Sequence, residues 1–219
     1  LILRNSRIFL PYFYVDHIQK VIYSTGDFYE RTTLHHLMQH YPNFKNIVEV
    51  GANIGNHMLF YATQMHASHV YCFEPNTLNR SSLEKNIELN HLEEIVTVFP
   101  VALGAAKADG VQSDTDLRNT GMSKVTVAAE GATKQVDIMP MDHYNFNNID
   151  FIKIDVEGHE LDVLKGAVET IRRNKPVVMA EIFEDHVNAA IEFFHDLGYM
   201  HAQTLEGHNF IFEHQSIKG

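Results

Sequence analysis

Hydrophobic residues along this chain occur in two patterns that alternate with one another. Short continuous runs, rich in valine and isoleucine, are typical of strands buried on both faces of a sheet. Apolar residues three or four positions apart, such as Leu83 and Ile87, follow most of these runs and indicate helices with one buried face. The expected strands cover residues 46–50, 69–74, 95–101, 151–155, 177–181, 199–203 and 209–212. This order predicts an α/β domain with a mostly parallel sheet, helices on both faces and a closing antiparallel hairpin.

The first strand runs directly into a turn of small residues, Gly51-Ala-Asn-Ile-Gly-Asn56. Glycine permits positive φ and close approach of the backbone, and asparagine tolerates left-handed geometry. A strand, a tight loop and a helix start can place backbone N–H groups around an adenosine-bearing ligand. Glu49, near the strand's end, can accept hydrogen bonds or face a positive charge. The residues expected to contact the cofactor here are Glu49, Gly51, Ala52, Asn53, Gly55 and Asn56.

The spacing of this loop distinguishes between adenosine cofactors. A dinucleotide fingerprint has the pattern G-x-G-x-x-G, whereas here Asn53 replaces the middle glycine and Gly55 comes one position early. The pattern is closer to the E/D-x-G-x-G-x-G loop of methyltransferases that use S-adenosyl-L-methionine (SAM). SAM has no phosphates and carries a sulfonium, which suits a carboxylate at Glu49. An ordinary glycine turn in an unrelated α/β protein is the alternative.

A second acidic residue, Glu74, ends the next strand, 23 positions after Gly51. A carboxylate at this point commonly accepts hydrogen bonds from both ribose hydroxyls of an adenosine cofactor. Pro75 follows it, and the small residue Ala102 after the third strand leaves room for an adenine ring. The alternative role for Glu74 is that of an N-cap or a favourable charge at the start of the following helix.

The third candidate segment, Asp155-Val-Glu-Gly-His-Glu160, crowds three carboxylates between a strand and a helix. Asp155 ends an otherwise apolar strand beside the expected cofactor crevice, and Glu181 ends the next strand. The candidate catalytic bases are Asp155, Glu157, His159 and Glu181, with Asp155 also a candidate for binding the cofactor's ammonium. The alternatives are helix-start charges for Glu157 and Glu160 and an exposed helix position for His159.

Two regions fall outside this strand–helix pattern. Residues 1–25 form an N-terminal segment expected to pack on the core of a domain spanning 26–219. Asp27 and Glu30 have the spacing of a capping box, which predicts a helix starting there. Residues 104–141 contain four glycines and two short β-prone pieces, which indicate an inserted hairpin. That insert is either a lid over cofactor and acceptor or ordinary surface structure.

Composition narrows the possible partners. The 219 residues carry a net charge of −11, which argues against nucleic acid, because phosphate binding needs clustered Lys and Arg. The single Cys72 excludes an intrachain disulfide. No apolar run approaches the roughly 20 residues of a membrane span, and neither signal peptide nor anchor is evident, so a cytoplasmic location is expected. Fifteen histidines show no zinc-ligand spacing, and no metal is expected.

Taken together, these segments resemble the FkbM family of SAM-dependent methyltransferases. The matching segments are Gly26–Glu30, Glu49–Asn56, Phe73–Pro75 and Ile152–Glu160, within a resemblance that covers roughly residues 20–213. The resemblance implies a Rossmann-like fold with strand order 3-2-1-4-5-7-6 and O-methylation of a hydroxyl on a sugar or natural-product-like small molecule. Two rival interpretations stay open: a nicotinamide-dependent oxidoreductase on a similar fold, and a SAM-binding module without catalysis. The oligomeric state is not predicted.

Overall fold

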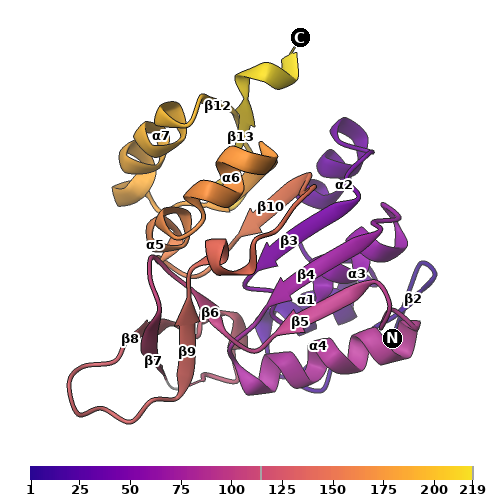
Figure 1. The fold of residues 1–219 in the computed structure, drawn as a ribbon. Helices are drawn as coiled ribbons and strands as arrows, with labels where there is room; N and C mark the ends of the chain where they lie inside the picture. The colour runs from indigo at the N-terminus through magenta and orange to yellow at the C-terminus, as the bar shows by residue number, and fades with distance from the viewer. Residues whose placement is uncertain (114, 219) are drawn as a thin grey trace.

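A computed structural model describes residues 1–113 and 115–218 and contains a seven-stranded mixed sheet (Figure 1). Read from one edge, its strands are β5 (Val96–Phe99), β4 (His69–Phe73), β3 (Asn46–Val50), β10 (Phe151–Ile154), β11 (Val177–Glu181), β13 (Asn209–His214) and β12 (Tyr199–Thr204). These are the third, second, first, fourth, fifth, seventh and sixth strands of this sheet along the chain. The first five are parallel, and β13 pairs antiparallel with both neighbours. The α/β class with a mixed sheet is therefore confirmed.

Alternate residues of each strand pack into different layers, as a period of two requires. Ile47, Cys72 and Phe151 belong to the core cluster beneath α1 to α4, whereas Val48 and Ile152 belong to the cluster beneath α5 to α7. The helices are α1 (His17–Thr25), α2 (Arg31–His40), α3 (Asn56–Thr63), α4 (Thr77–Asn90), α5 (Glu160–Lys165), α6 (Val168–Asn174) and α7 (Val187–Asp196). Burial on both faces explains the continuous apolar strands.

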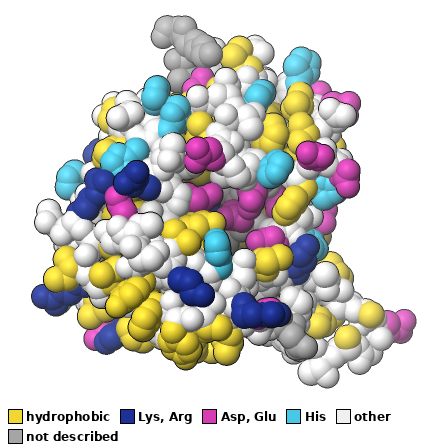
Figure 2. Space-filling model, turned by 180° about the vertical axis from the view of Figure 1, so that it is seen from behind, with side chains coloured by type: hydrophobic (Ala, Val, Ile, Leu, Met, Phe, Trp, Pro, Cys, Tyr) yellow, Lys and Arg dark blue, Asp and Glu magenta, His cyan; other side chains and the backbone are white. Residues whose placement is uncertain are grey.

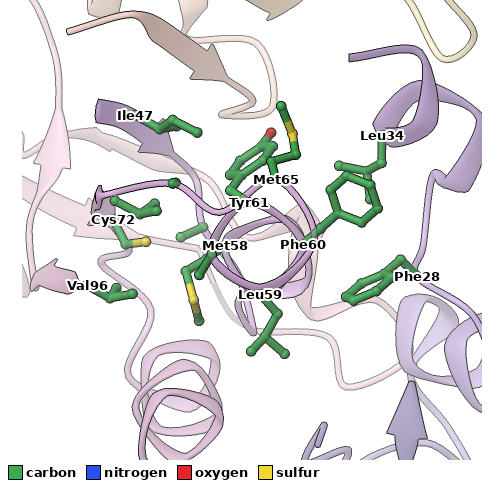
Figure 3. Packing of buried hydrophobic residues seen from close by; sticks show 14 of the residues in the cluster. Phe28, Leu34, Ile47, Met58, Leu59, Phe60, Tyr61, Met65, Cys72 and Val96 are labelled. Carbon is green, nitrogen blue, oxygen red and sulfur yellow. The ribbon is translucent and has the colours of Figure 1, made fainter. Parts of the chain in front are cut away.

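Helix α3, which follows the glycine loop, lies at the centre of the first layer. Its residues from Asn56 to Ala62 are all buried, so it shows no polar face. Figure 3 shows Met58 and Tyr61 in the same cluster as the strand residues Ile47 and Cys72, and Phe60 close to Phe28 from the segment before α2. This burial fixes the start of α3, and with it the end of the glycine loop, against the sheet.

The region between β5 and β10 forms a second, four-stranded sheet rather than a single hairpin. Its order is β6 (Ala102–Leu103), β9 (Val136–Met139), β7 (Ala108–Gln112) and β8 (Val125–Val127). The two β-prone pieces predicted from sequence are β8 and β9, but the glycine-containing β7 was not expected to be a strand. The small sheet projects from the main body beyond the carboxyl ends of β3 and β4 (Figure 1).

The N-terminal residues pack on the first layer as a small hairpin and a helix. Strands β1 (Ile2–Leu3) and β2 (Ser6–Arg7) pair antiparallel, and helix α1 follows. Asp16 caps α1 by accepting from Gln19 N, and it also accepts from the backbone and hydroxyl groups of Thr120. One carboxylate thus connects the start of α1 to the loop before β8.

The predicted helix start at Asp27 is wrong. Helix α1 ends at Thr25 with Gly26 as its C-cap, and α2 begins only at Arg31, after Glu30 in a left-handed conformation. Asp27 accepts a hydrogen bond from Phe28 N and lies 3.6 Å from guanidinium nitrogens of Arg4 and Arg31. The capping-box spacing was satisfied by chance, because this segment serves as a linker between two helices.

None of the helices in the described part of the chain combines the length and the apolar character required to cross a membrane.

Candidate functional site

The carboxyl ends of β3, β4, β10 and β11 surround a cavity of about 380 Å³. This volume lies within the usual range for small-molecule sites, about 300–1,000 Å³. Acidic side chains gather near the centre of the face seen in Figure 2, where the surface is hollowed. The sequence-predicted residues that line the cavity are Glu49, Gly51, Ala52, Asn53, Asn56, Glu74, Pro75, Ala102, Asp155, Glu157, His159 and Glu181. Of the predicted set, Gly55 alone does not line it.

The glycine loop has the backbone conformation that its residue types predict. Gly51, Asn53 and Gly55 have φ values of 82°, 51° and 83°. A Cβ on Gly51 would lie 1.9 Å from the Asp155 carbonyl oxygen, far inside contact distance. One on Gly55 would lie 2.5 Å from Leu83 Cδ1. The glycines therefore allow the loop to pack against the end of β10 on one side and against α4 on the other.

We expect Gly51→Ala to destabilise the protein by at least about 2 kcal/mol more than Gly131→Ala. Both glycines have a φ of 82°, so both substitutions place alanine in the left-handed region. A Cβ added at Gly131 would have no atom within 4 Å, whereas a Cβ added at Gly51 would clash with the backbone of Asp155. Denaturant unfolding of the two variants measures the difference, and equal losses of stability would show that the close approach to Asp155 is unimportant.

The loop's amides bond within the protein, which corrects the expectation that they surround a ligand. The amides of Gly51 and Ala52 donate to the Phe73 carbonyl oxygen at 3.0 and 3.1 Å. The third, of Asn53, donates to Glu74 Oε2 at 2.7 Å. The remaining two amides, at positions 54 and 55, donate to Asn53 Oδ1 and Ala52 O. A pyrophosphate site needs such amides free, so this loop does not offer the anion-binding geometry of a dinucleotide fold.

Glu74 is buried at the tip of β4, with only 5% of its surface exposed. Its Oε2 accepts from Asn53 N, and its Oε1 accepts from Asn76 N at 2.8 Å. Burial raises the pKa of Glu74 to about 7, although both backbone hydrogen bonds act to lower it. The helix start is capped by Asn76, whose side chain accepts from two amides of α4. Glu74 is therefore not needed as the helix cap.

Lys153 is a buried cation in the cavity wall that the sequence analysis missed. It lies in β10 with 3% of its surface exposed, and its Nζ is 3.0 Å from Asp155 Oδ2. Burial disfavours its charge, but the carboxylates of Asp155, Glu49 and Glu30 outweigh that effect and raise the pKa of Lys153. A lysine within the apolar run Phe151–Ile154 was the available signal, because fully buried lysines are almost always paired.

Asp155 and Glu181 end the neighbouring strands β10 and β11 and differ in protonation. Burial favours the neutral form of Asp155, but the Lys153 charge outweighs it and lowers the pKa of Asp155. Burial, followed by the hydrogen bond to Asp155 and its charge, raises the pKa of Glu181 to about 9. At neutral pH, Asp155 is therefore the anion and Glu181 holds a proton. Burial and the charge of Asp155 also raise the pKa of Glu157.

A histidine from the start of α3 connects two further carboxylates. His57 Nδ1 lies 3.7 Å from Glu49 Oε1, and His57 Nε2 lies 3.1 Å from Glu30 Oε2. Burial, with a contribution from Lys153, lowers the pKa of His57, so the ring is neutral. Burial raises the pKa of Glu49 to about 8. His57 was not among the predicted site residues, and the spacing of Glu30 from Asp27 had predicted a role in a helix cap.

Asn56 holds the segment before α2 against α3. Its Oδ1 accepts from Tyr29 N at 2.9 Å, and its Nδ2 donates to Tyr29 O at 3.1 Å. Both ends of the amide are thus engaged, although Asn56 faces the cavity. This pair of bonds keeps Tyr29 and Glu30 at the cavity rim, which explains why a distant segment contributes to the site.

The segment after β10 turns sharply at Glu157 and Gly158, with φ values of 55° and 98°. His159 precedes α5 and lines the cavity, and its buried Nδ1 has no hydrogen-bond partner among the described residues. Glu160 is completely buried and accepts from Gly158 N at 2.7 Å. Glu160 thus stabilises the turn, whereas Glu157 and His159 face the cavity.

Comparison with known proteins relates this chain to methyltransferases. Residues 49–211 match the family model described as the methyltransferase FkbM domain. Methyltransferase 1 of Beauveria bassiana is 23% identical over 58% of this chain and 59% of its own length. The hexuronic acid methyltransferase AglP of Haloferax volcanii is 29% identical over 57% of this chain and 50% of its own length. The chain thus spans little more than half the length of these curated relatives.

A solved structure has a similar fold. The crystal structure of methyltransferase FkbM from Methylobacillus flagellatus KT superposes with a TM-score of 0.53 at 21% identity. The similarity covers 79% of this chain and 44% of that one. At this identity the comparison supports the fold alone.

Proposed function

This chain belongs to the FkbM methyltransferase family, and on that premise we propose that it transfers a methyl group from SAM to a hydroxyl of a sugar or sugar-like small molecule. The observation that carries the proposal is the convergence of Glu49, Glu74 and Asp155 on one cavity. These carboxylates come from three neighbouring strand ends, at the edge where ligands bind in open α/β sheets.

The residues around the cavity fit SAM better than a phosphate-bearing cofactor. The amides of residues 51–55 are already bonded within the protein, so they are not available to a pyrophosphate. Glu49 and Glu74 have raised pKa values of about 8 and about 7 because they are buried. A ligand that brings hydroxyl donors and positive charge stabilises such carboxylates as anions. These features disfavour the alternative of a nicotinamide-dependent oxidoreductase.

Three acidic residues contact the cofactor in this proposal. Glu74 accepts hydrogen bonds from the ribose hydroxyls, and Glu49 or Asp155 pairs with the ammonium group of the methionine moiety. Gly51 allows close packing of the loop, and Pro75 and Ala102 border the space for adenine. When bound, SAM supplies a methyl group on a positively charged sulfur.

Asp155 is the base that we favour for the acceptor hydroxyl. Alignment of the reacting groups contributes most to such a displacement, and a base that removes the hydroxyl proton assists it. Asp155 is anionic at neutral pH and about 30% exposed toward the cavity. Glu181 already holds a proton, while Glu157 and His159 lie further along the same turn and serve to position the acceptor.

The four-stranded sheet and the loop before β8 form part of the cavity wall. Ser123, Val125, Val127 and Ile138 from this sheet and its preceding loop line the cavity. We therefore favour the role of a cover over cofactor and acceptor for residues 104–141. The similarity to AglP, named for methylation of a hexuronic acid, supports a saccharide acceptor.

Titration calorimetry with SAM and with NAD tests the cofactor assignment. We expect wild-type protein to bind SAM and not NAD. Glu74→Ala should weaken SAM binding by about 10- to 100-fold, because hydrogen bonds to a charged group contribute about 1.5–3 kcal/mol. Unchanged SAM affinity in this variant would remove the ribose assignment, and tight NAD binding by wild type would favour the oxidoreductase.

Glu84→Ala is the matched control for Glu74→Ala. Glu84 is an exposed glutamate on α4 that pairs with Arg80 at 3.7 Å, so its removal should leave SAM affinity unchanged. A methyl-transfer assay with a panel of saccharides then separates an enzyme from a binding module. SAM binding without transfer to any acceptor would favour the non-catalytic alternative.

A further inference from the structure

The N-terminal residues expose an unusual amount of apolar surface. Of the thirteen large hydrophobic residues that are exposed in the described part of the chain, six lie within residues 1–23. Among these six residues, Ile2, Tyr14 and Tyr23 are the most exposed, at 70%, 68% and 54%. We call this set the N-terminal apolar surface; its members are Leu1, Ile2, Phe9, Phe13, Tyr14 and Tyr23. In Figure 2, apolar and basic side chains gather over this part of the molecule.

Core packing does not explain this surface, because other residues of the same segment fill the core. Leu3, Ile8 and Ile22 are buried in the first layer. On α1, the outward face should be polar in a helix that only covers a sheet. The exposed residues of α1 are polar except for Tyr23, which contacts the ring of Phe13, with ring centroids 4.4 Å apart.

The charge of this segment is opposite to that of the whole chain. Residues 1–25 contain three basic residues and one acidic residue, whereas the complete chain has a net charge of −11. The acidic residue is Asp16, which is buried and bonded to Thr120. Arg7 and Lys20 are exposed and make no ion pair with any residue that the structure describes. The apolar surface is therefore accompanied by positive charge that has no counterion.

We propose that the N-terminal apolar surface docks on a lipid bilayer that carries anionic headgroups. Exposed tyrosine and phenylalanine suit the boundary between headgroups and acyl chains, and lysine or arginine beside them are attracted to anionic lipid. A second copy of the chain fits less well, because a symmetric contact would place Arg7 and Lys20 near their own counterparts. A bilayer can contact the apolar side chains with its acyl region and the basic side chains with its anionic headgroups.

Docking in this way places the cavity near the membrane surface. Helix α1 carries Lys20 and Tyr23 on its outer side, while its Ile18 lines the cavity. The same helix is held to the loop before β8 through Asp16 and Thr120. The docking surface and one wall of the cavity therefore belong to a single packed unit.

Sedimentation with lipid vesicles tests the proposal without cofactor or acceptor, so its outcome is independent of the proposed function. We expect wild-type protein to bind vesicles containing phosphatidylserine and to bind pure phosphatidylcholine weakly, with binding falling as salt rises. Arg7→Glu/Lys20→Glu should lower the partition coefficient on phosphatidylserine vesicles by about tenfold or more. Tyr14→Ser/Tyr23→Ser should lower binding to both kinds of vesicle.

Phe183→Ser/Ile191→Ser is the matched control. These two hydrophobic residues each have 39% of their surface exposed and are distant in sequence from the N-terminal apolar surface. This control should bind vesicles like wild type, and circular dichroism should show all variants folded. Absence of binding to phosphatidylserine vesicles, or equal binding by control and surface variants, would overturn the proposal. So would a wild-type dimer in sedimentation velocity that Tyr14→Ser/Tyr23→Ser converts to monomer, because the surface would then belong to a second copy.

Discussion

Replacing Asp155 with asparagine is expected to slow methyl transfer by about 10²- to 10⁴-fold, the usual contribution of a general base. Asparagine keeps the shape of the side chain but accepts no proton. Lys153 lowers the pKa of Asp155, so in the wild-type protein Asp155 is anionic at neutral pH, whereas Glu181, with a pKa raised to about 9, is protonated. Single-turnover rates at saturating SAM measure the loss, and calorimetry shows whether SAM still binds.

Glu157→Gln provides the comparison for Asp155→Asn. Glu157 lies two residues away, lines the same cavity and is also a carboxyl group, but it lacks the contact with Lys153. We expect its substitution to change the rate by less than about tenfold, since its effect is on acceptor position. If Asp155→Asn retained full activity while Glu157→Gln lost it, the base assignment would pass to Glu157.

Replacing Lys153 with methionine is expected to lower the free energy of unfolding by about 3–5 kcal/mol, as when one member of a buried ion pair is removed. Methionine fills much of the volume, so the loss comes from uncompensated charge rather than from a void. Asp155, Glu49 and Glu30 would then face one another without a cation. Denaturant unfolding at neutral pH measures the change.

Two further variants separate this charge effect from a packing effect. Lys153→Met/Asp155→Asn should lose less stability than the sum of the single variants, because the second change removes the unpaired carboxylate. Lys165→Met, which breaks an exposed pair with Asp162 at 2.9 Å, should cost less than about 1 kcal/mol. Additive losses in the double variant would contradict the coupling of Lys153 to Asp155.

The pH dependence of turnover in Lys153→Met gives an independent readout. Lys153 lowers the pKa of Asp155, so its removal should raise that pKa. If Asp155 acts as the base, activity is lost as it becomes protonated, and the acid limb of the pH–rate profile should move to higher pH. A profile that keeps its midpoint while the protein is destabilised would indicate a purely structural role for Lys153.

The amino-acid sequence was sufficient to predict the strands of the seven-stranded sheet, the helical layers and the conformation of the glycine loop. Each depends on local properties: continuous apolar runs for doubly buried strands, and residues that tolerate positive φ for the loop. For this reason β11 begins and ends where the sequence predicted, and Gly51, Asn53 and Gly55 are all left-handed. The small sheet was harder to predict because its strands are short and β7 contains a glycine.

Only the tertiary structure decided which further groups join the predicted residues in the cavity, how the side chains pair there and what charges they carry. The pairing of Lys153 with Asp155, and of His57 with Glu30, joins side chains from β10, α3 and the linker before α2. Spacing along the chain does not specify such contacts, because hydrogen bonds and charges act through space. The same holds for the loop amides of residues 51–55, which looked available to a ligand in sequence and are bonded within the protein once β4 lies beside them.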